Sequence, residues 1–270
     1  MPELPEVETV RRSLERLIAG QSIVAVQVRE PRLRKPVAKN FAAILTGRVI
    51  HSVGRRGKYL NLRLDDEHVW LVHLGMTGQL TVCDPQTPLR THDHVVMTLG
   101  DGRALRYNDP RRFGLMLVGT ATEIEAAMAL GVEPLSAAFS PRYLQEKAQL
   151  TRRTVKDVLM DQRVVAGVGN IYASELLFRA QVQPSRLVPT LDAEEMTRVV
   201  KATKAVLREA ITHRGSSISD YRDGEGQPGD FQTRFRVYDR EGQPCRTCKD
   251  PIRRETHGGR SSFFCSTCQV

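Results

Sequence analysis

The sequence predicts an α+β fold with an N-terminal β-sandwich led by a helix, then a helical domain, then a four-cysteine β-hairpin. Short runs of alternating apolar and polar residues fill much of the chain from 22 to 118, which is typical of a sandwich or barrel. Apolar spacing becomes helical after residue 133, and two Cys-x-x-Cys pairs stand near the chain end. We therefore place the domains at 1–132, 133–230 and 231–270.

The leading helix is predicted from the residues that follow Pro5. Val10, Leu14 and Ile18 recur at helical spacing, with charged residues on the opposite face. Gly20 then ends the pattern, because glycine commonly follows the last helical turn.

Elements beyond residue 22 follow the same two periodicities. The β-like runs lie at 23–28, 59–64, 68–74, 94–99 and 115–118. The helical segments lie at 141–148, 155–160, 171–179 and 193–213. Residues 216–229 are rich in Ser, Gly and Asp, which predicts a mobile surface loop.

Four of the five cysteines form a metal-ligand pattern. Cys245 pairs with Cys248 and Cys265 with Cys268, and the interval between the pairs is long enough for a β-hairpin. Four thiolates can close the tetrahedral shell of one Zn²⁺ and leave no position for a catalytic water. We expect one structural zinc ion, with a redox dithiol pair as the alternative. Cys83 is left over and is predicted to be a buried thiol.

The charge balance favours a polyanionic partner. Forty Lys and Arg against 31 Asp and Glu give a formal charge of +9 and a pI near 9.6. Charge alone makes nucleic acid only the first candidate. No segment approaches a membrane span and no secretory signal is visible, so a cytoplasmic enzyme is the expectation.

The N-terminus contains a candidate nucleophile. Removal of Met1 would leave the secondary amine of Pro2 at the chain end, beside Glu3 and Glu6. Such an amine has a pKa of about 8, and it can attack an electrophilic carbon to form an iminium ion. Alternatively, Pro2 only starts a helix and the carboxylates only complement its dipole. If Met1 stayed, the proline nitrogen would be an amide and this chemistry would fail.

Six motifs in a fixed order carry a resemblance to a known family. They are Pro2 to Thr9, Arg55 to Leu60, His73 to Gly78, Tyr107 to Gly114, Gly167 to Glu175, and the terminal four-cysteine finger. Together they resemble bacterial formamidopyrimidine-DNA glycosylase along the whole chain. Each fragment alone would be weak, and the ordered combination is specific.

The resemblance implies a bifunctional DNA glycosylase and AP lyase of base excision repair. Such an enzyme removes 8-oxoguanine and formamidopyrimidines, then cuts the abasic site by β,δ-elimination. Pro2 would form the Schiff base, Glu3 would be the principal acid/base, and Glu6 would orient the amine or contact the sugar. Lys58 and Arg260 complete the implied catalytic set. A solvated lysine, or a lysine Schiff base instead of Pro2, is the alternative for Lys58.

The resemblance also implies how double-stranded DNA is held. Met76, Arg111 and Phe113 would fill the gap left by a flipped nucleotide, although core packing is the alternative for Met76 and Phe113. Asn170 would bind a phosphate from a helix-two-turn-helix element. Further implied DNA contacts are Glu6, His73 and His92, with Ser217, Ser219 and Tyr221 in a lesion-capping loop. For His73, a structural histidine with its hydrogen bonds satisfied is the alternative. The implied enzyme acts as a monomer at the bacterial nucleoid.

Two other functions remain open at this point. The endonuclease VIII-like branch of the same superfamily prefers oxidised pyrimidines, and the set Met76, Arg111 and Phe113 argues against it. A non-catalytic zinc-containing DNA-binding protein would need only the basic charge and the finger. Such a protein has no use for the dipeptide Pro2-Glu3.

Overall fold

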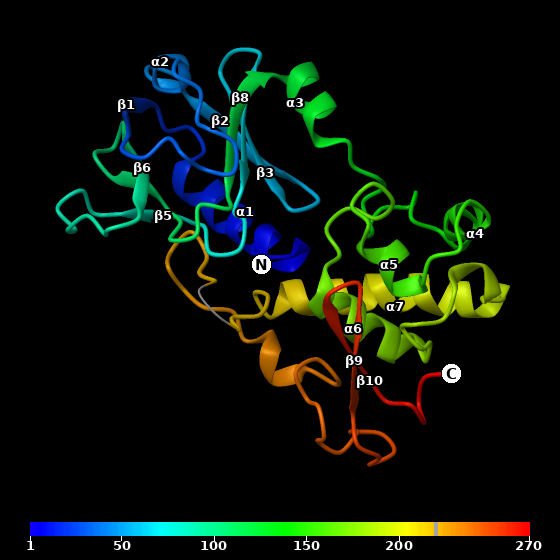
Figure 1. The fold of residues 1–270 in the computed structure, drawn as a ribbon. Coiled ribbons are helices and arrows are strands. Elements are labelled where there is room, and N and C mark those ends of the chain that lie inside the picture. The colour runs from blue at the N-terminus through cyan, green and yellow to red at the C-terminus, as the bar shows by residue number, and fades with distance from the viewer. Residues whose placement is uncertain (219–220) are drawn as a thin grey trace. The chain divides into compact units, whose positions relative to one another are not determined.

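The chain forms two compact units, each assembled from separate parts of the sequence (Figure 1). The computed structural model describes residues 1–218 and 221–270. The first unit contains Met1–Ala129 and His213–Asp230, and the second contains Leu130–Thr212 and Phe231–Val270. Among the described residues, the helices are too short or too polar for any of them to cross a membrane.

Most of the strands belong to the first unit and most of the helices to the second. The first unit contains α1 (Leu4–Ile18), β1 (Ile23–Val28), α2 (Phe41–Leu45), β2 (Ile50–Arg56), β3 (Tyr59–Leu64), β4 (His68–His73), β5 (Gln79–Cys83), β6 (Asp93–Leu99), β7 (Ala104–Asn108), β8 (Leu115–Thr120) and α3 (Ala121–Met128). The second contains α4 (Pro141–Gln149), α5 (Val155–Met160), α6 (Asn170–Ala180), η1 (Val188–Thr190), α7 (Ala193–Thr212), η2 (Phe231–Arg234), β9 (Arg253–His257) and β10 (Arg260–Phe264).

Two antiparallel four-stranded sheets enclose the core of the first unit. Their strand orders are β1-β6-β7-β5 and β2-β3-β4-β8. Both sheets and α1 contribute to one apolar cluster, which includes Leu14 and Ile18. Trp70 of β4 lies edge-on to Phe41 of α2 in this cluster, with 6.1 Å between ring centroids. The predicted sandwich with a leading helix is confirmed.

Much of the segment 216–229 is packed against the first unit. Tyr221 belongs to the core cluster, and the Gly224 N–H donates to Ser13 Oγ at 2.8 Å. The Gly224 carbonyl accepts from the Val82 N–H at 3.0 Å, at the edge of β5. A Cβ on Gly224 would lie 2.7 Å from Ser13 Oγ, so this approach requires glycine. The expectation of a surface loop is wrong at Tyr221 and Gly224, whose polar groups are buried and hydrogen-bonded, whereas Arg222 and residues 225–228 are exposed as expected.

The cysteine-rich hairpin is an integral part of the second unit. Phe178 of α6 packs in one cluster with Ile252 and Phe263 of the hairpin region. The Glu175 carboxylate, which is buried in α6, accepts the backbone N–H groups of residues 236–238 at 2.8–3.1 Å. The chain entering the hairpin is therefore tied to the helix by both apolar and polar contacts.

The sequence patterns missed several short elements of the first unit. Strands β2 and β5 and helices α2 and α3 were not predicted, whereas the five predicted strands, the leading helix and the four later helices are present within a few residues. Short strands depend on their neighbours more than on their own composition, so periodicity detects them poorly. Cys83, at the end of β5, is half-buried, and burial raises the pKa of its thiol.

Candidate functional site

The start of α1 places the candidate nucleophile next to a buried carboxylate. Pro2 is buried, Glu3 is 3 % exposed, and Met1 before them is exposed. Glu3 is the N-cap residue, so the helix begins only at Leu4. Glu3 and Glu6 are joined through the backbone, because the Glu3 N–H donates to Glu6 Oε2 at 2.9 Å.

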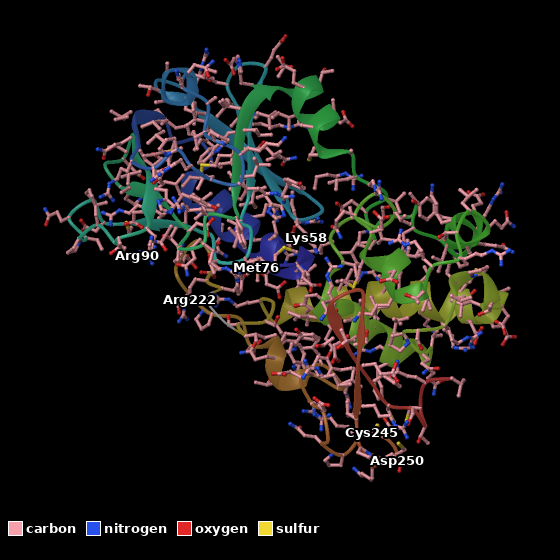
Figure 2. All side chains as sticks on the ribbon, viewed as in Figure 1. Lys58, Met76, Arg90, Arg222, Cys245 and Asp250 are labelled. Atoms are coloured by element: carbon pink, nitrogen blue, oxygen red, sulfur yellow. The ribbon has the colours of Figure 1, made fainter. Side chains whose placement is uncertain are left out.

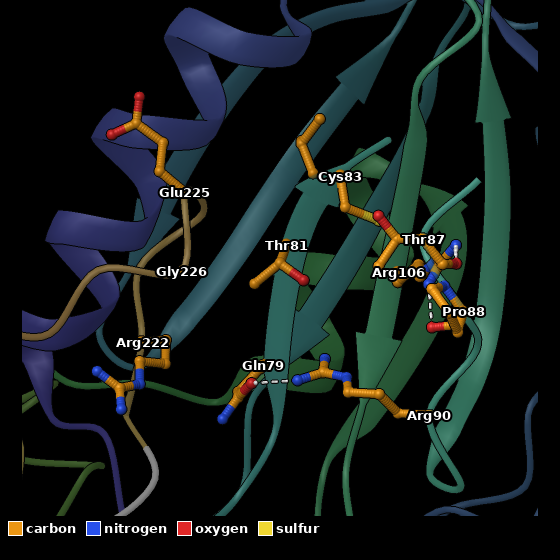
Figure 3. A pocket seen from close by; sticks show the side chains of 11 residues that line it. Gln79, Thr81, Cys83, Thr87, Pro88, Arg90, Arg106, Arg222, Glu225 and Gly226 are labelled. Carbon is orange, nitrogen blue, oxygen red and sulfur yellow. Dashed lines mark hydrogen bonds between the residues drawn. The ribbon is translucent and has the colours of Figure 1, made fainter. Parts of the chain in front are cut away.

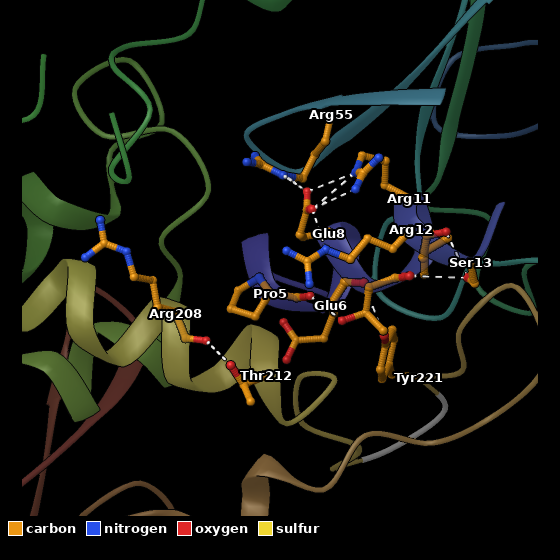
Figure 4. Close-up of polar contacts among 12 residues, drawn as sticks. Pro5, Glu6, Glu8, Arg11, Arg12, Ser13, Arg55, Arg208, Thr212 and Tyr221 are labelled. Carbon is orange, nitrogen blue, oxygen red and sulfur yellow. Dashed lines mark hydrogen bonds and ion pairs between the residues drawn. The ribbon is translucent and has the colours of Figure 1, made fainter. Parts of the chain in front are cut away.

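Glu6 holds the start of α1 to the segment after α7 within the first unit. Its Oε1 accepts the Ser216 N–H at 2.7 Å and the Ser216 hydroxyl at 3.0 Å. The Tyr221 hydroxyl donates to the Glu6 carbonyl at 3.2 Å, as Figure 4 shows for this end of the helix. Glu6 is only 2 % exposed, and its carboxylate oxygens accept hydrogen bonds from groups of its own unit.

Glu8 lies on the next part of the same helix and has a different environment. It bonds to the guanidinium groups of Arg11, Arg12 and Arg55 (Figure 4). Burial alone would raise the pKa of Glu8, but the hydrogen bonds from Arg11 and Arg12 bring it below its usual value. Glu8 therefore stays ionised and is an unsuitable proton donor.

Lys58 and His73 form a second group of buried polar residues in the first unit. Lys58 lies in the turn between β2 and β3 and is 5 % exposed (Figure 2). His73 ends β4, and its Nδ1 accepts the Gly75 N–H at 3.0 Å. Burial, followed by the charges of Lys58 and Arg34, lowers the pKa of His73 to about 4. The ring is thus neutral at pH 7, with Nε2–H as its donor.

The three predicted gap-filling residues come from two loops of the first unit. Met76 (labelled in Figure 2) is 38 % exposed and Phe113 is 47 % exposed, so neither is a core residue. The Arg111 guanidinium carbon lies 4.8 Å from the centroid of the Phe113 ring. A Cβ on Gly75 would lie 2.5 Å from the Phe113 carbonyl carbon, so the two loops touch through their backbones. We name Met76, Arg111 and Phe113 the wedge.

His92 lies beside a hollow of about 410 Å³ in the same unit. Its ring is exposed, and its centroid is 5.8 Å from that of His94. Arg29 and Arg112 also line the hollow, but so do the carboxylates of Glu30 and Asp93, so the formal charges of its walls are balanced.

The predicted lesion-capping residues differ in how they are placed. The Ser217 hydroxyl donates to the Tyr221 carbonyl at 3.1 Å and accepts the Gly229 N–H at 2.9 Å. Tyr221 is 7 % exposed and faces α1. Ser219 lies outside the described residues.

Asn170 and Arg260 belong to the second unit. Asn170 begins α6, and its Nδ2 donates to the Ser261 carbonyl at 3.0 Å. Arg260 is exposed and precedes Ser261 at the start of β10. The helix start and the hairpin are therefore joined directly beside Arg260.

The four cysteines predicted to bind metal converge at the base of the hairpin, where Figure 2 labels Cys245. Their sulfur atoms all lie within 4.8 Å of one another, with Cys245 and Cys268 at 3.9 Å and Cys248 and Cys265 at 3.4 Å. Tetrahedral zinc–thiolate geometry requires sulfur separations of roughly 3.8 Å. The residues therefore fit one structural Zn²⁺ ion.

A further hollow of about 380 Å³ lies against β5, where the loop 84–92 and residues 222–226 meet it (Figure 3). Arg106 in its wall donates to the carbonyls of Thr87 and Pro88. Arg90 bonds to the Asp93 carboxylate and to Gln79 Oε1 at 3.3 Å. Because these two cations already have partners in the wall, they stabilise the loop.

Three polar residues that hold site elements were missed by sequence reasoning. Asp109 is fully buried beneath the wedge loops, and Gln162 bonds the Gly167 N–H at 2.8 Å in the turn before α6. Both were detectable as polar residues within or next to the family-like motifs. Lys156 donates to the Ser261 carbonyl at 2.9 Å from 105 residues away, and no local pattern could have revealed that contact.

Comparison with known proteins gives a consistent result for every segment. Models of the formamidopyrimidine-DNA glycosylase N-terminal domain, of its H2TH domain, and of a zinc finger found in FPG and IleRS match residues 1–116, 130–222 and 242–270. Formamidopyrimidine-DNA glycosylases of Edwardsiella ictaluri and Klebsiella pneumoniae are 46 % and 44 % identical over 270 residues, covering 100 % of both chains in each case.

Solved structures agree with these sequence matches. The MutM (Fpg) protein of Thermus thermophilus is 42 % identical with a TM-score of 0.89, covering 99 % of this chain and 98 % of that one. Lactococcus lactis Fpg in complex with abasic-site DNA is 32 % identical with a TM-score of 0.92, covering 99 % of both chains. With matching models for all three segments and full-length relatives at 44 % and 46 % identity, the chain belongs to the formamidopyrimidine-DNA glycosylase family.

Proposed function

We propose that this protein is a bifunctional DNA glycosylase and AP lyase of base excision repair that removes oxidised purines. The observation that carries the proposal is Pro2, buried beside the carboxylate of Glu3 at the start of α1, in a chain of this family. Family membership supports a DNA glycosylase, and relatives are solved with Fapy-dG and abasic-site DNA. The preference for 8-oxoguanine and formamidopyrimidines over pyrimidines belongs to the proposal.

In the proposed reaction, the free Pro2 nitrogen attacks C1′ of the damaged nucleotide. The C–N bond to the base breaks, and the base leaves with the electron pair and takes up a proton. The sugar ring opens at the C1′–O4′ bond to give an iminium ion, with Glu3 donating the proton to O4′. Glu3 is suited to this exchange because it is buried beside the nucleophile.

Strand cleavage follows from the same iminium ion. It acidifies the C2′ proton, whose loss expels the 3′-phosphate, and a second elimination expels the 5′-phosphate. Water then hydrolyses the iminium and frees Pro2. Lys58 and Arg260 would contact phosphates that flank the lesion, because a cation stabilises the charge that develops on a leaving phosphate.

The remaining candidates are proposed to hold double-stranded DNA. The wedge would fill the gap in the duplex, with Arg111 donating to the estranged base. Asn170, the neutral His73 through Nε2–H, and His92 would contact phosphates. Ser217 and the segment around it would face the flipped base, while Glu6 and Tyr221 would hold that segment to α1. We propose a monomer acting in the bacterial cytoplasm.

Borohydride trapping tests this proposal. Purified protein is incubated with an 8-oxoguanine·cytosine duplex and, in parallel, with a duplex containing an oxidised pyrimidine, and the covalent adduct is mapped by peptide sequencing. An adduct on Pro2 that forms faster with 8-oxoguanine is expected. A pyrimidine preference would move the protein to the endonuclease VIII-like specificity. DNA binding without any adduct would favour the non-catalytic function.

A further inference from the structure

The two wedge loops are connected by a buried carboxylate and a hydroxyl outside the proposed catalytic set. Asp109 is fully buried. Its Oδ1 accepts the Thr77 hydroxyl at 2.6 Å, and its Oδ2 accepts the Gly114 N–H at 2.8 Å and the Tyr107 hydroxyl at 3.1 Å. The Thr77 oxygen in turn accepts the Arg111 N–H at 3.3 Å. One network thus touches residues next to all three members of the wedge.

The chemistry of this network fixes the direction of its hydrogen bonds. Burial, followed by the negative charge of Asp109, raises the pKa of Tyr107, so its hydroxyl keeps its proton and donates. The Gly114 N–H can only donate. Both oxygens of Asp109 therefore accept hydrogen bonds. The Thr77 hydroxyl donates to Asp109 and accepts the Arg111 N–H.

We propose that Thr77 is a positioning residue which, through Asp109, holds the Met76 loop and the Arg111–Phe113 loop in register as one preformed wedge. The inference rests on the proposed function. Thr77 follows Met76 directly, whereas Asp109 precedes Arg111 by two positions, so the 2.6 Å bond links the side chains of the two loops. Thr77 itself need not touch DNA.

A preformed wedge matters because it must occupy the gap in the DNA duplex for as long as the damaged nucleotide is flipped out. Met76 and Phe113 are exposed, so packing in the core does not order their side chains. If the loops moved independently, the cost of ordering them would fall on the step that flips the nucleotide. Because the Thr77–Asp109 bond forms when the protein folds, the loops are already ordered before DNA binds.

The test is Thr77→Val, with Thr77→Ser as the matched control. Valine keeps the shape of threonine and removes the hydroxyl, whereas serine keeps the hydroxyl. Thr77 is only half-buried, so neither change should prevent folding. We expect single-turnover excision of 8-oxoguanine opposite cytosine to fall at least about fivefold for the valine variant, because it loses both the bond to Asp109 and the bond accepted from the Arg111 N–H. The serine variant should stay within about twofold of wild type.

Three further measurements separate positioning from general damage. Cleavage of a preformed abasic site in single-stranded DNA, which has no gap to fill, should be unchanged by Thr77→Val. In a Phe113→Ala background, the valine change should add little further loss, because it acts through the wedge. Discrimination between cytosine and adenine opposite the lesion should also weaken, since the Arg111 loop reads the estranged base.

The alternative outcomes are distinct. Equal excision by wild type and Thr77→Val would overturn the inference, and so would a parallel loss of single-stranded cleavage or full additivity with Phe113→Ala. If wild type itself gives no Pro2 adduct in the trapping experiment, the proposed function has failed, whatever the Thr77 variants do.

Discussion

The start of α1 and the wedge belong to the same unit but differ in how far their side chains are exposed. Glu3 and Glu6 are 3 % and 2 % exposed, whereas Met76 and Phe113 are 38 % and 47 % exposed. Glu6 uses its carboxylate oxygens on backbone N–H groups and a hydroxyl of its own unit. The wedge side chains instead point away from the core. The hydrogen bonds proposed to position them are made by buried Asp109 beneath the two loops.

This difference fits the role that is proposed for each region. Proton transfer and iminium chemistry gain from fixed groups shielded from water, which the buried helix start provides. A side chain that enters a DNA helix must be exposed before it binds, so its order has to come from neighbouring backbone. Changes at the helix start should therefore abolish chemistry or folding, and changes at the wedge should weaken activity by moderate factors.

The largest effect is expected from blocking the Pro2 nitrogen. Two preparations are compared, one with a cleavable tag left before Pro2 and one with Pro2 freed by cleavage. The blocked nitrogen is an amide and cannot attack C1′, so excision and borohydride trapping should fall by at least about a thousandfold. Binding to the damaged duplex, measured by fluorescence anisotropy, should change by less than about threefold, since phosphate contacts supply most of the affinity. Equal activity of both preparations would assign the Schiff base to another amine.

The helix start also shows how far sequence could lead. Amphipathic spacing predicted α1, and the terminal motif predicted Pro2 and Glu3 as the reactive pair. The partner of Glu6 could not be predicted, because Ser216 is 210 residues away and its segment has the composition of a loop. Similarly, exposure of Met76 and Phe113 depends on loop geometry that periodicity does not encode. Local patterns predicted most of the elements and suggested the reactive groups, while the long-range polar contacts needed the structure.

The next largest effect is expected from Glu6→Ala. The substitution leaves the Glu3 N–H and both donors of Ser216 buried without their acceptor. Unpaired buried donors of this kind should lower the free energy of unfolding by roughly 3 kcal/mol, measured by urea denaturation. The control is Glu225→Ala, because Glu225 is 42 % exposed and its pair with Arg16 lies on the surface. That control should change stability by less than about 1 kcal/mol. Equal effects from the two changes would mean that the Glu6 contacts carry no special weight.

A smaller and pH-dependent effect is expected from His73, which lies in the buried part of the unit. Its pKa is about 4 in the folded protein, against about 6.5 in an unfolded chain. Below pH 6.5 His73 is protonated in the unfolded chain but not in the folded protein. The free energy of unfolding therefore falls as the pH is lowered towards 4. Between pH 7 and pH 5 this amounts to about 2 kcal/mol. His73→Gln should lose correspondingly less stability over that interval, whereas His92→Gln, at an exposed position, should behave as wild type. Identical pH profiles for wild type and His73→Gln would show that the imidazole does not titrate as its burial requires.

The smallest effect, and the sharpest test of the comparison, is expected from Phe113→Ala at the wedge. The ring is 47 % exposed and packs against the Arg111 guanidinium, so its removal should change the free energy of unfolding by less than about 0.5 kcal/mol. Excision from an 8-oxoguanine duplex should nevertheless fall about tenfold, because the flipped nucleotide loses part of the surface that replaces it in the stack.

Leu89→Ala removes a side chain of similar exposure in the loop before β6 and serves as the control, with no expected change in excision. A stability loss as large as that of Glu6→Ala would place Phe113 among the structural residues, and the contrast between a buried reactive end and an exposed wedge would fail. Unchanged stability together with slower excision would show that the two regions divide the work, one performing the chemistry and the other holding the DNA open for it.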